Sequence, residues 1–276
     1  MKKILVPTDF SQQAENALKI AAQFARKDNF EIVLVHLLEL PMQTIDPVGG
    51  VGTNEMPEAL FFMKLAKKRF NETIAQDYLE GITIHKKVQF NSAFRGIIDT
   101  CKEFDCELII MGSQGATGFE EMLIGSNTEK VVRNSEVPVL VIKNEHENFT
   151  VNNFAFAIDF DTENKKTLQQ AMDFARLLQA KLHLVHINTS GDSEKSEEAE
   201  RQVRDFVEDY GFKNYSFNIH KDSSVEKGIL NFAKEIGAEL IGIATHGRKG
   251  LAHFFNGSIS EDLVNHAKIP VVTFRL

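Results

Sequence analysis

The feature that most constrains the fold of this chain is an internal duplication. Residues 4–10 align with residues 154–160, and the same register places Leu34-Val35-His36 over Leu184-Val185-His186. After one change of register the match resumes in four further pairs of segments: Gly96-Ile97 with Gly228-Ile229, Glu107-Leu108-Ile109 with Glu239-Leu240-Ile241, Gly125-Ser126 with Gly257-Ser258, and Pro138-Val139 with Pro270-Val271. Self-similarity on this scale predicts two copies of one folding unit, and 276 residues are enough for two domains.

Composition places the predicted domain boundaries. The polar run from Asn144 to Asn153 is typical of a linker, so the copies are expected to form domains of residues 1–145 and 150–276. The change of register is one insertion after His36, where the first copy carries a Gly-rich loop from Pro41 to Pro57 that the second copy lacks.

Within each copy, short apolar runs alternate with longer amphipathic segments, which predicts a parallel sheet with helices on both faces. We expect five strands and four helices per copy. The expected strands of the first copy are Ile4 to Pro7, Ile32 to Leu37, Thr83 to Val88, Leu108 to Met111 and Val139 to Ile142. Those of the second copy are Phe154 to Ile158, Leu182 to Ile187, Tyr215 to Ile219, Leu240 to Ala244 and Val271 to Thr273.

Two helix starts carry their own signals. Asp9 and Ser11 precede the first helix, and their side chains can accept hydrogen bonds from the N–H groups of its first turn. In the second copy, an exposed acidic stretch from Ser193 to Glu200 is expected to precede the second helix.

Charge and cysteine content exclude several classes of protein. The net charge of -8 would repel a polyanion, so nucleic acid is not an expected partner. No apolar run approaches the roughly 18 residues of a membrane span, and Pro7 ends the first apolar run too early for a signal peptide. Cys101 and Cys106 are expected on different faces of one helix, as reduced packing residues. These features predict a soluble cytoplasmic protein.

The segment after the fourth strand of the first copy carries the clearest chemical signal. It reads Gly112-Ser113-Gln114-Gly115-Ala116-Thr117-Gly118, and Gly125-Ser126-Asn127-Thr128 then opens a helix. Glycines allow a backbone to approach a ligand closely, and the free N–H groups and positive dipole end of a helix suit a phosphate. The hydroxyl groups of Ser126 and Thr128 can add donors.

This G-x2-G-x9-G-[ST] spacing, with Val6-Pro7-Thr8-Asp9 before it and residues 137–142 after it, resembles the universal stress protein family. Both copies resemble it, as a tandem pair. The resemblance implies two doubly wound α/β domains of the adenine nucleotide alpha hydrolase-like type. Each would have a five-stranded parallel sheet in the order 3-2-1-4-5, and the nucleotide-binding members bind an adenine nucleotide. In that order the chain reverses direction between strands 1 and 4, where a crevice opens at the carboxyl ends.

The resemblance also assigns roles to residues. Asp9 and the backbone near Leu37 would hold the adenosine, the Gly112 and Gly115 segment would approach the ribose and phosphates, and the start of the following helix would cap the phosphates. The expected nucleotide-binding residues are Pro7, Thr8, Asp9, Leu37, Met111, Gly112, Gly115, Gly125, Ser126, Asn127 and Thr128 in the first copy, and Asp159, Ile187, Ala244, Gly247, Arg248, Gly257 and Ser258 in the second. The expected ligand is ATP or AMP, with Mg2+ as a companion ion and no metal site of the protein's own.

Each copy departs from the family pattern in its own way. Gln114 and Ala116 stand where family members commonly have His and Arg, and Glu120 and Glu121 follow. This change should weaken triphosphate binding by about 1 kcal/mol per exposed contact. The second copy keeps cations at His246, Arg248 and Lys249 but has Ala244 in place of the first glycine.

Simpler structural roles compete with these assignments. Asp9 and Asp159 can be helix N-caps, and four glycines can serve only turns with positive φ: Gly115, Gly118, Gly247 and Gly250. His36 and His186 end buried strands and are more simply core histidines. A metal set of His246, His253 and His266 lacks a supporting carboxylate or cysteine.

Three functions remain open at this point. The leading one is a tandem universal stress protein that binds an adenine nucleotide in a regulatory or protective role. A nucleotide hydrolase or transferase using the same crevice is the second. The chain has no Walker A sequence, no nucleophile elbow and no evident catalytic base, so at most slow ATPase activity is expected. The third is a nucleotide-free scaffold with decayed pockets, in which the Pro41 to Pro57 loop docks a protein partner.

The assembly is also predicted. The strands Val139 to Ile142 and Val271 to Thr273 are expected at sheet edges, which tend to find a partner. In single-domain relatives that edge forms the dimer, so the resemblance implies that the two copies pair within one chain about a pseudo-twofold axis. A homodimer of such tandems is a further expectation.

Overall fold

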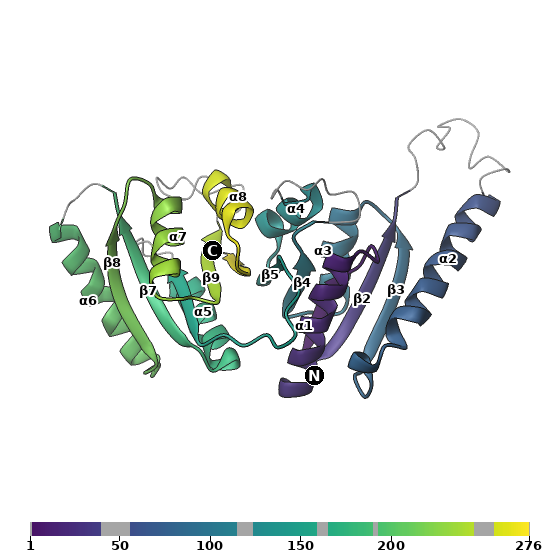
Figure 1. The fold of residues 1–276 in the computed structure, drawn as a ribbon, viewed down its shortest axis with the longest axis horizontal. Helices are drawn as coiled ribbons and strands as arrows, with labels where there is room; N and C mark the ends of the chain where they lie inside the picture. The colour runs from purple at the N-terminus through teal and green to yellow at the C-terminus, as the bar shows by residue number, and fades with distance from the viewer. Residues whose placement is uncertain are drawn as a thin grey trace.

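The computed structural model describes residues 2–39, 56–114, 124–158, 165–189, 193–245 and 257–275. Its strands form one ten-stranded sheet in the order β3-β2-β1-β4-β5-β10-β9-β6-β7-β8 (Figure 1). The elements of the first copy are β1 (Lys3–Pro7), α1 (Gln12–Asp28), β2 (Glu31–Leu38), α2 (Met56–Ile74), the short 3-10 helix η2 (Asp77–Leu79), β3 (Ile84–Phe90), α3 (Ala93–Glu103), β4 (Leu108–Gly112), α4 (Ser126–Asn134) and β5 (Val139–Ile142). Those of the second copy are β6 (Asn153–Ala157), α5 (Lys165–Leu178), β7 (Lys181–Asn188), α6 (Ser193–Asp209), β8 (Tyr215–Lys221), α7 (Val225–Glu235), β9 (Leu240–Thr245), α8 (Gly257–His266) and β10 (Val271–Arg275).

The predicted α/β fold is confirmed in both copies. Each half of the sheet has the strand order 3-2-1-4-5, and its five strands are parallel to one another. Strands alternate their side chains between two faces. Ile4 therefore belongs to the hydrophobic cluster that includes α1 and α5, and Leu5 belongs to the cluster that includes α3 and α7. The four helices expected per copy cover these two faces. Both hydrophobic layers therefore run through the two copies without a break.

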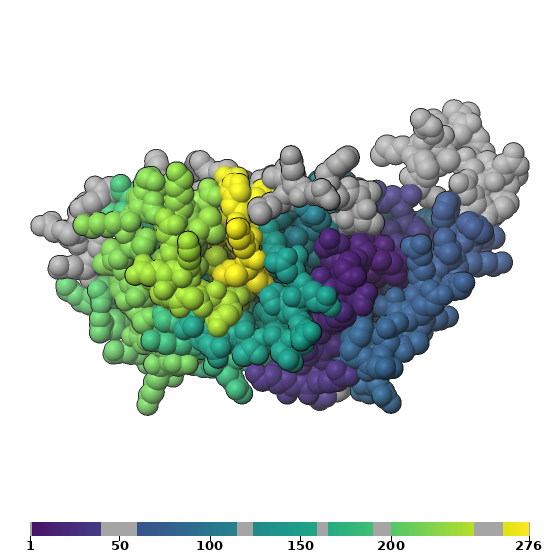
Figure 2. Space-filling model, viewed as in Figure 1, coloured from purple at the N-terminus to yellow at the C-terminus, as the bar shows by residue number. Residues whose placement is uncertain are grey.

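The two copies join along β5 and β10, which pair antiparallel with Leu140 opposite Val272. This confirms that the terminal strands pair within one chain. Figure 2 shows the C-terminal segment, in yellow, between the two halves of the molecule. A cation follows or ends each of these strands: Lys143 Nζ donates to the carbonyl of Asn265 (3.2 Å), and Arg275 donates to the carbonyl of Asn134 (2.8 Å). Each cation thus binds a carbonyl near the C-terminus of the other copy's last helix, where positive charge is favourable.

Three local predictions need correction. Residues 40–55 lie outside the described part, but Pro57 belongs to helix α2 and not to a loop. Proline is tolerated there because the N–H groups of a first helical turn have no intrahelical partner. In the second copy, α6 already begins at Ser193, so the acidic stretch forms the start of the helix and does not precede it.

The cysteine prediction is wrong in geometry. Helix α3 ends at Glu103, so Cys106 lies beyond it, after Asp105 in the left-handed conformation (φ 54). The N–H of Cys106 donates to the carbonyl of Cys101 (2.9 Å), as in a Schellman helix end, and the Cys101 thiol donates to the carbonyl of Cys106 (3.8 Å). Both thiols are free and buried, as packing residues are. The hydrogen bond with Cys101, together with burial, raises the pKa of the Cys106 thiol well above its usual range.

The partly buried Lys143 at the junction of the copies gives a testable pH dependence. Burial lowers its pKa to about 8, whereas an unfolded lysine titrates near 10.4. Between these pH values the unfolded chain binds more protons than the folded one, so this residue makes stability rise with pH. The cost in stability of partly burying the charged Lys143 amine is complete below pH 8 and disappears as the pH approaches 10.4.

Denaturant unfolding of the wild type and Lys143→Met between pH 7 and pH 10 checks this expectation. The wild type should gain stability relative to the variant by about 1–2 kcal/mol as the pH rises through this window. A difference that stays constant with pH would show that the amine keeps its ordinary hydration in the folded protein.

Candidate functional site

A pocket of about 220 Å³ lies at the carboxyl ends of β1 and β4, where the strand order reverses. Ten of the residues that the sequence assigned to the first copy line it together: Pro7, Thr8, Asp9, Leu37, Met111, Gly112, Gly125, Ser126, Asn127 and Thr128. Gly115 lies outside the described residues. Three strand ends and the start of one helix, far apart in the sequence, therefore meet at one place. Whether they bind a nucleotide stays a prediction.

The turn from β1 to α1 forms one wall of the pocket. Ser11 is the N-cap of α1, because its side chain accepts the N–H of Ala14 (3.3 Å). Asp9 accepts the N–H of Ser11 (3.0 Å), so it braces the turn without being the N-cap itself. The Thr8 N–H donates to the carbonyl of Val35 on β2 (2.8 Å). These bonds fix Asp9 at the pocket mouth.

The start of α4 also lines the pocket. Gly125 is its N-cap and offers no side chain to the N–H groups of the first turn. Helix α3, which also faces the pocket, is different, because the carboxylate of Glu39 accepts the N–H of Ala93 at its first residue (2.7 Å). The first N–H groups of an α-helix have no intrahelical partner. No side-chain cap at Gly125 accepts those of α4, and such N–H groups suit an anionic ligand.

Two contacts hold α4 against the end of β4. The N–H of Gly125 donates to the carbonyl of Ser113 (2.7 Å). The buried hydroxyl of Thr128 donates to the carbonyl of Gly112 (3.0 Å). The structure thus uses the Thr128 hydroxyl to position the helix, whereas the sequence suggested it as a donor to phosphate. Ser126 and Asn127 remain exposed at the helix start.

Two glycines near the pocket have packing roles that the sequence did not reveal. A Cβ added at Gly112 would lie 2.9 Å from backbone atoms of Gln13, so its absence allows α1 to pack on β4. A Cβ at Gly96 would lie 2.4 Å from the Leu37 side chain, which packs there against α3. The same arrangement recurs in the second copy, where Gly228 faces Ile187. The repeated Gly-Ile pairs of the sequence mark this packing site.

Sequence reasoning missed part of the lining. Ala14, Val35, Ala93 and Ile97 also line the pocket. Ile97 could have been found, because it forms part of a repeated pair, but nothing in the local pattern marks the other three. They come from buried faces of helices and strands, and only packing brings them to the pocket. Gln114, noted above as a departure from the family pattern, lines it as well.

The histidine predictions are partly answered. His36 is partly buried. Its Nδ1 lies 2.7 Å from the carbonyl of Thr8, and its ring contacts Phe10 with centroids 4.6 Å apart, so one ring nitrogen has a partner within the fold. His266 pairs with Glu226, while His246 and His253 lie outside the described residues. Within the described ranges, no three metal-ligating side chains come together.

The second copy can be compared only in part. Ile187 and Ala244 are buried at the ends of β7 and β9, and Gly257 and Ser258 begin α8. Asp159, Gly247 and Arg248 lie outside the described residues. Where β4 has an isoleucine, β9 has Gly242, at which a Cβ would lie 2.6 Å from the ring of Phe154. The interior of the second copy is therefore built around phenylalanine rings.

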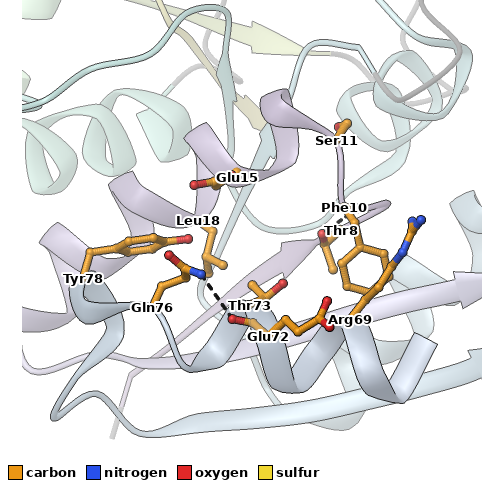
Figure 3. A pocket seen from close by; sticks show the side chains of 10 residues that line it. All are labelled: Thr8, Phe10, Ser11, Glu15, Leu18, Arg69, Glu72, Thr73, Gln76 and Tyr78. Carbon is orange, nitrogen blue, oxygen red and sulfur yellow. Dashed lines mark hydrogen bonds between the residues drawn. The ribbon is translucent and has the colours of Figure 1, made fainter. Parts of the chain in front are cut away.

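A second pocket, of about 390 Å³, lies between α1 and α2. Figure 3 shows Tyr78 and Phe10 at its two ends with Thr73 between them. The Arg69 guanidinium lies over the Phe10 ring, 5.7 Å from its centroid, and burial raises the pKa of Tyr78 to about 12. No sequence signal marked this pocket, because it forms between two helices that lie far apart in the sequence. Its carboxylates, Glu15 and Glu72, make it less suited to an anion than the pocket at α4.

The described helices include none that is both long and apolar enough to cross a bilayer.

Comparison with known proteins agrees with this architecture. The sequence profile of the universal stress protein family matches residues 1–143 and again residues 150–275. A universal stress protein of Synechocystis sp. is 24% identical to the chain, with 100% of both chains covered. Another, from Methanocaldococcus jannaschii, is 33% identical over 52% of this chain and 96% of its own length. In fold, the chain resembles the crystal structure of a universal stress protein from Archaeoglobus fulgidus, with a TM-score of 0.74, 23% identity and coverage of 99% of this chain and 96% of that one. The chain therefore belongs to the universal stress protein family.

Proposed function

We propose that the first copy binds an adenine nucleotide, ATP or AMP, in the pocket at the carboxyl ends of β1 and β4, and that the protein serves a regulatory or protective role in the stress response. The observation that carries the proposal is that the start of α4, whose N-cap Gly125 provides no side-chain cap, lines one pocket together with the braced Asp9 at the reversal of strand order. Open α/β sheets bind ligands at this position.

The lining divides into two parts with different chemistry. Val35, Ile97 and Met111 give an apolar surface for a purine, and the Asp9 carboxylate can accept a hydrogen bond from a ribose hydroxyl. The start of α4 offers backbone N–H groups, which suit phosphates. Because 220 Å³ is below the roughly 300–1,000 Å³ typical of pockets for drug-sized ligands, we place the nucleoside inside and the phosphates at the open end, beside Ser126. Mg2+ would enter with the phosphates, and we assign it no protein ligand.

The same lining argues against efficient hydrolysis. Among the pocket residues that the structure describes, Asp9 is the one ionisable side chain. Its carboxylate already accepts the N–H of Ser11, and no histidine or lysine stands beside it in the lining. A general base must reach the proton it removes within hydrogen-bond distance. We therefore propose a binding protein whose conformation or partner choice depends on the nucleotide.

Thermal unfolding with and without millimolar ATP or AMP tests the proposal, with GTP as the control for the base. A nucleotide at a hundred times its Kd should stabilise the protein by about 2.7 kcal/mol, and phosphate release should stay below about one turnover per second. Mass analysis of nucleotides that copurify identifies the ligand. Unchanged unfolding with every nucleotide would favour the scaffold, and faster turnover would favour a hydrolase.

A further inference from the structure

One side chain of the second copy contacts the residue just before α4, the helix whose start lines the pocket of the first copy. Asn265, near the end of α8, accepts the backbone N–H of Ile124 through its side-chain oxygen at 2.7 Å. The main-chain carbonyl of Asn265 also accepts Lys143 Nζ at 3.2 Å. A single residue therefore holds two points of the first copy, one before α4 and one after β5.

The first of these points adjoins the proposed phosphate site. Ile124 precedes Gly125, the N-cap of α4, whose own N–H donates to the carbonyl of Ser113. The two successive N–H groups are thus fixed from two directions, one by the end of β4 and one by the second copy. Since the Gly125 carbonyl accepts the N–H of Glu129 (3.0 Å), these bonds set where the first turn of α4 begins. They therefore set the direction of the N–H groups that face the pocket.

The repeat does not reproduce this contact with the same chemistry. The register that aligns Gly125-Ser126 with Gly257-Ser258 places Arg133 opposite Asn265. A guanidinium group donates hydrogen bonds and cannot accept one. Arg133 therefore cannot do for the second copy what the Asn265 carboxamide does for the first.

We propose that Asn265 is a positioning residue for the first copy's pocket, through which the second copy fixes the phosphate-binding end of α4. The inference rests on the proposed function for its effect on binding, but the contact itself can be tested alone. The geometry of the first copy's pocket then depends on the second copy. A movement of α8 relative to α4 would change nucleotide affinity in the first copy.

The experiment compares the full-length wild type with Asn265→Ala and Lys143→Met. In Asn265→Ala, calorimetric titration with ATP or AMP should give a Kd raised roughly three- to tenfold, the range expected for one lost hydrogen bond. Hydrogen exchange of the Ile124 amide should become faster. Lys143→Met removes the other contact of Asn265 with the first copy and keeps the carboxamide, so both its Kd and the exchange of Ile124 should match the wild type.

A second variant separates loss of the acceptor from general loosening. Asn265→Asp keeps an oxygen in the same place, so protection of the Ile124 amide should return. If the wild type binds nucleotide and Asn265→Ala binds equally well, the inference is wrong while the proposed function stands. If the wild type binds none, the proposed function fails, and fast Ile124 exchange confined to Asn265→Ala still supports the contact. Ile124 exchange that is the same in the wild type and Asn265→Ala would overturn it.

Discussion

Replacing Gly112 with alanine should destabilise the protein by roughly 1–3 kcal/mol, the usual cost of forcing extra atoms into a packed interior. The new methyl group would lie 2.9 Å from backbone atoms of Gln13. A flexible side chain could turn away, but the backbone of α1 can yield only by moving the helix. That movement would carry the turn that holds Asp9, so nucleotide affinity should fall as well. Denaturant unfolding measures the first effect and calorimetric titration the second.

The second copy supplies the matched control. Ala244 occupies the corresponding position on β9 and is buried with its methyl group already accommodated. Ala244→Gly should therefore change stability only by the roughly 0.5–1 kcal/mol that a glycine costs within a strand. Equal stability of Gly112→Ala and the wild type would mean that α1 shifts freely on β4. The close approach would then have no energetic importance.

Replacing Ser126 with aspartate should weaken nucleotide binding at least tenfold, which corresponds to about 1.4 kcal/mol. The carboxylate would stand at the start of α4, beside the place proposed for the phosphates, and like charges repel. The same substitution should leave the fold intact or make it slightly more stable, by about 0.3–1 kcal/mol, because a negative charge is favourable at a helix N-terminus. Titration with ATP and AMP, together with thermal unfolding without ligand, separates the two effects.

The control for this variant is Ser258→Asp, at the matching position of α8 in the second copy. It adds the same charge to the same chain without touching the first pocket, so binding to the first copy should be unchanged. Wild-type affinity in Ser126→Asp would place the phosphates elsewhere. Loss of affinity in both variants alike would show an effect of net charge and not of the site.

Much of the site could be predicted because strand ends are visible in a sequence. Pro7-Thr8-Asp9 and Gly112 each follow an apolar run, and parallel strands bring such ends to one edge of a sheet. The two copies of the repeat each indicated five strands. The capping role of Ser11 could also be predicted, since it depends on residues within one turn. Strand ends and helix caps depend on residues that are close together in the sequence, so the local sequence pattern predicts them.

Other features could not be predicted because they depend on how elements pack. Cys106 was predicted to be helical, but α3 ends at Glu103 and Asp105, just before Cys106, is in the left-handed conformation. The Thr128 hydroxyl looked free to bind phosphate, but burial against β4 commits it to the carbonyl of Gly112. The pocket between α1 and α2 is lined by residues of both helices, and no spacing within either helix encodes how far apart the two lie.

The sequence by itself determined the duplicated α/β architecture, the family and the strand ends that meet at the pocket, because each is written in periodicity, in turn residues and in the repeat. Only the tertiary structure decided which donors remain available to a ligand and which are used internally. It also brought the carboxamide of Asn265 to the N–H of Ile124, just before α4 of the other copy. The physical reason is that a hydrogen bond between residues 141 positions apart depends on the antiparallel pairing of β5 with β10. That pairing sets the distance between α8 and the start of α4, and no pattern within either segment predicts that they are in contact.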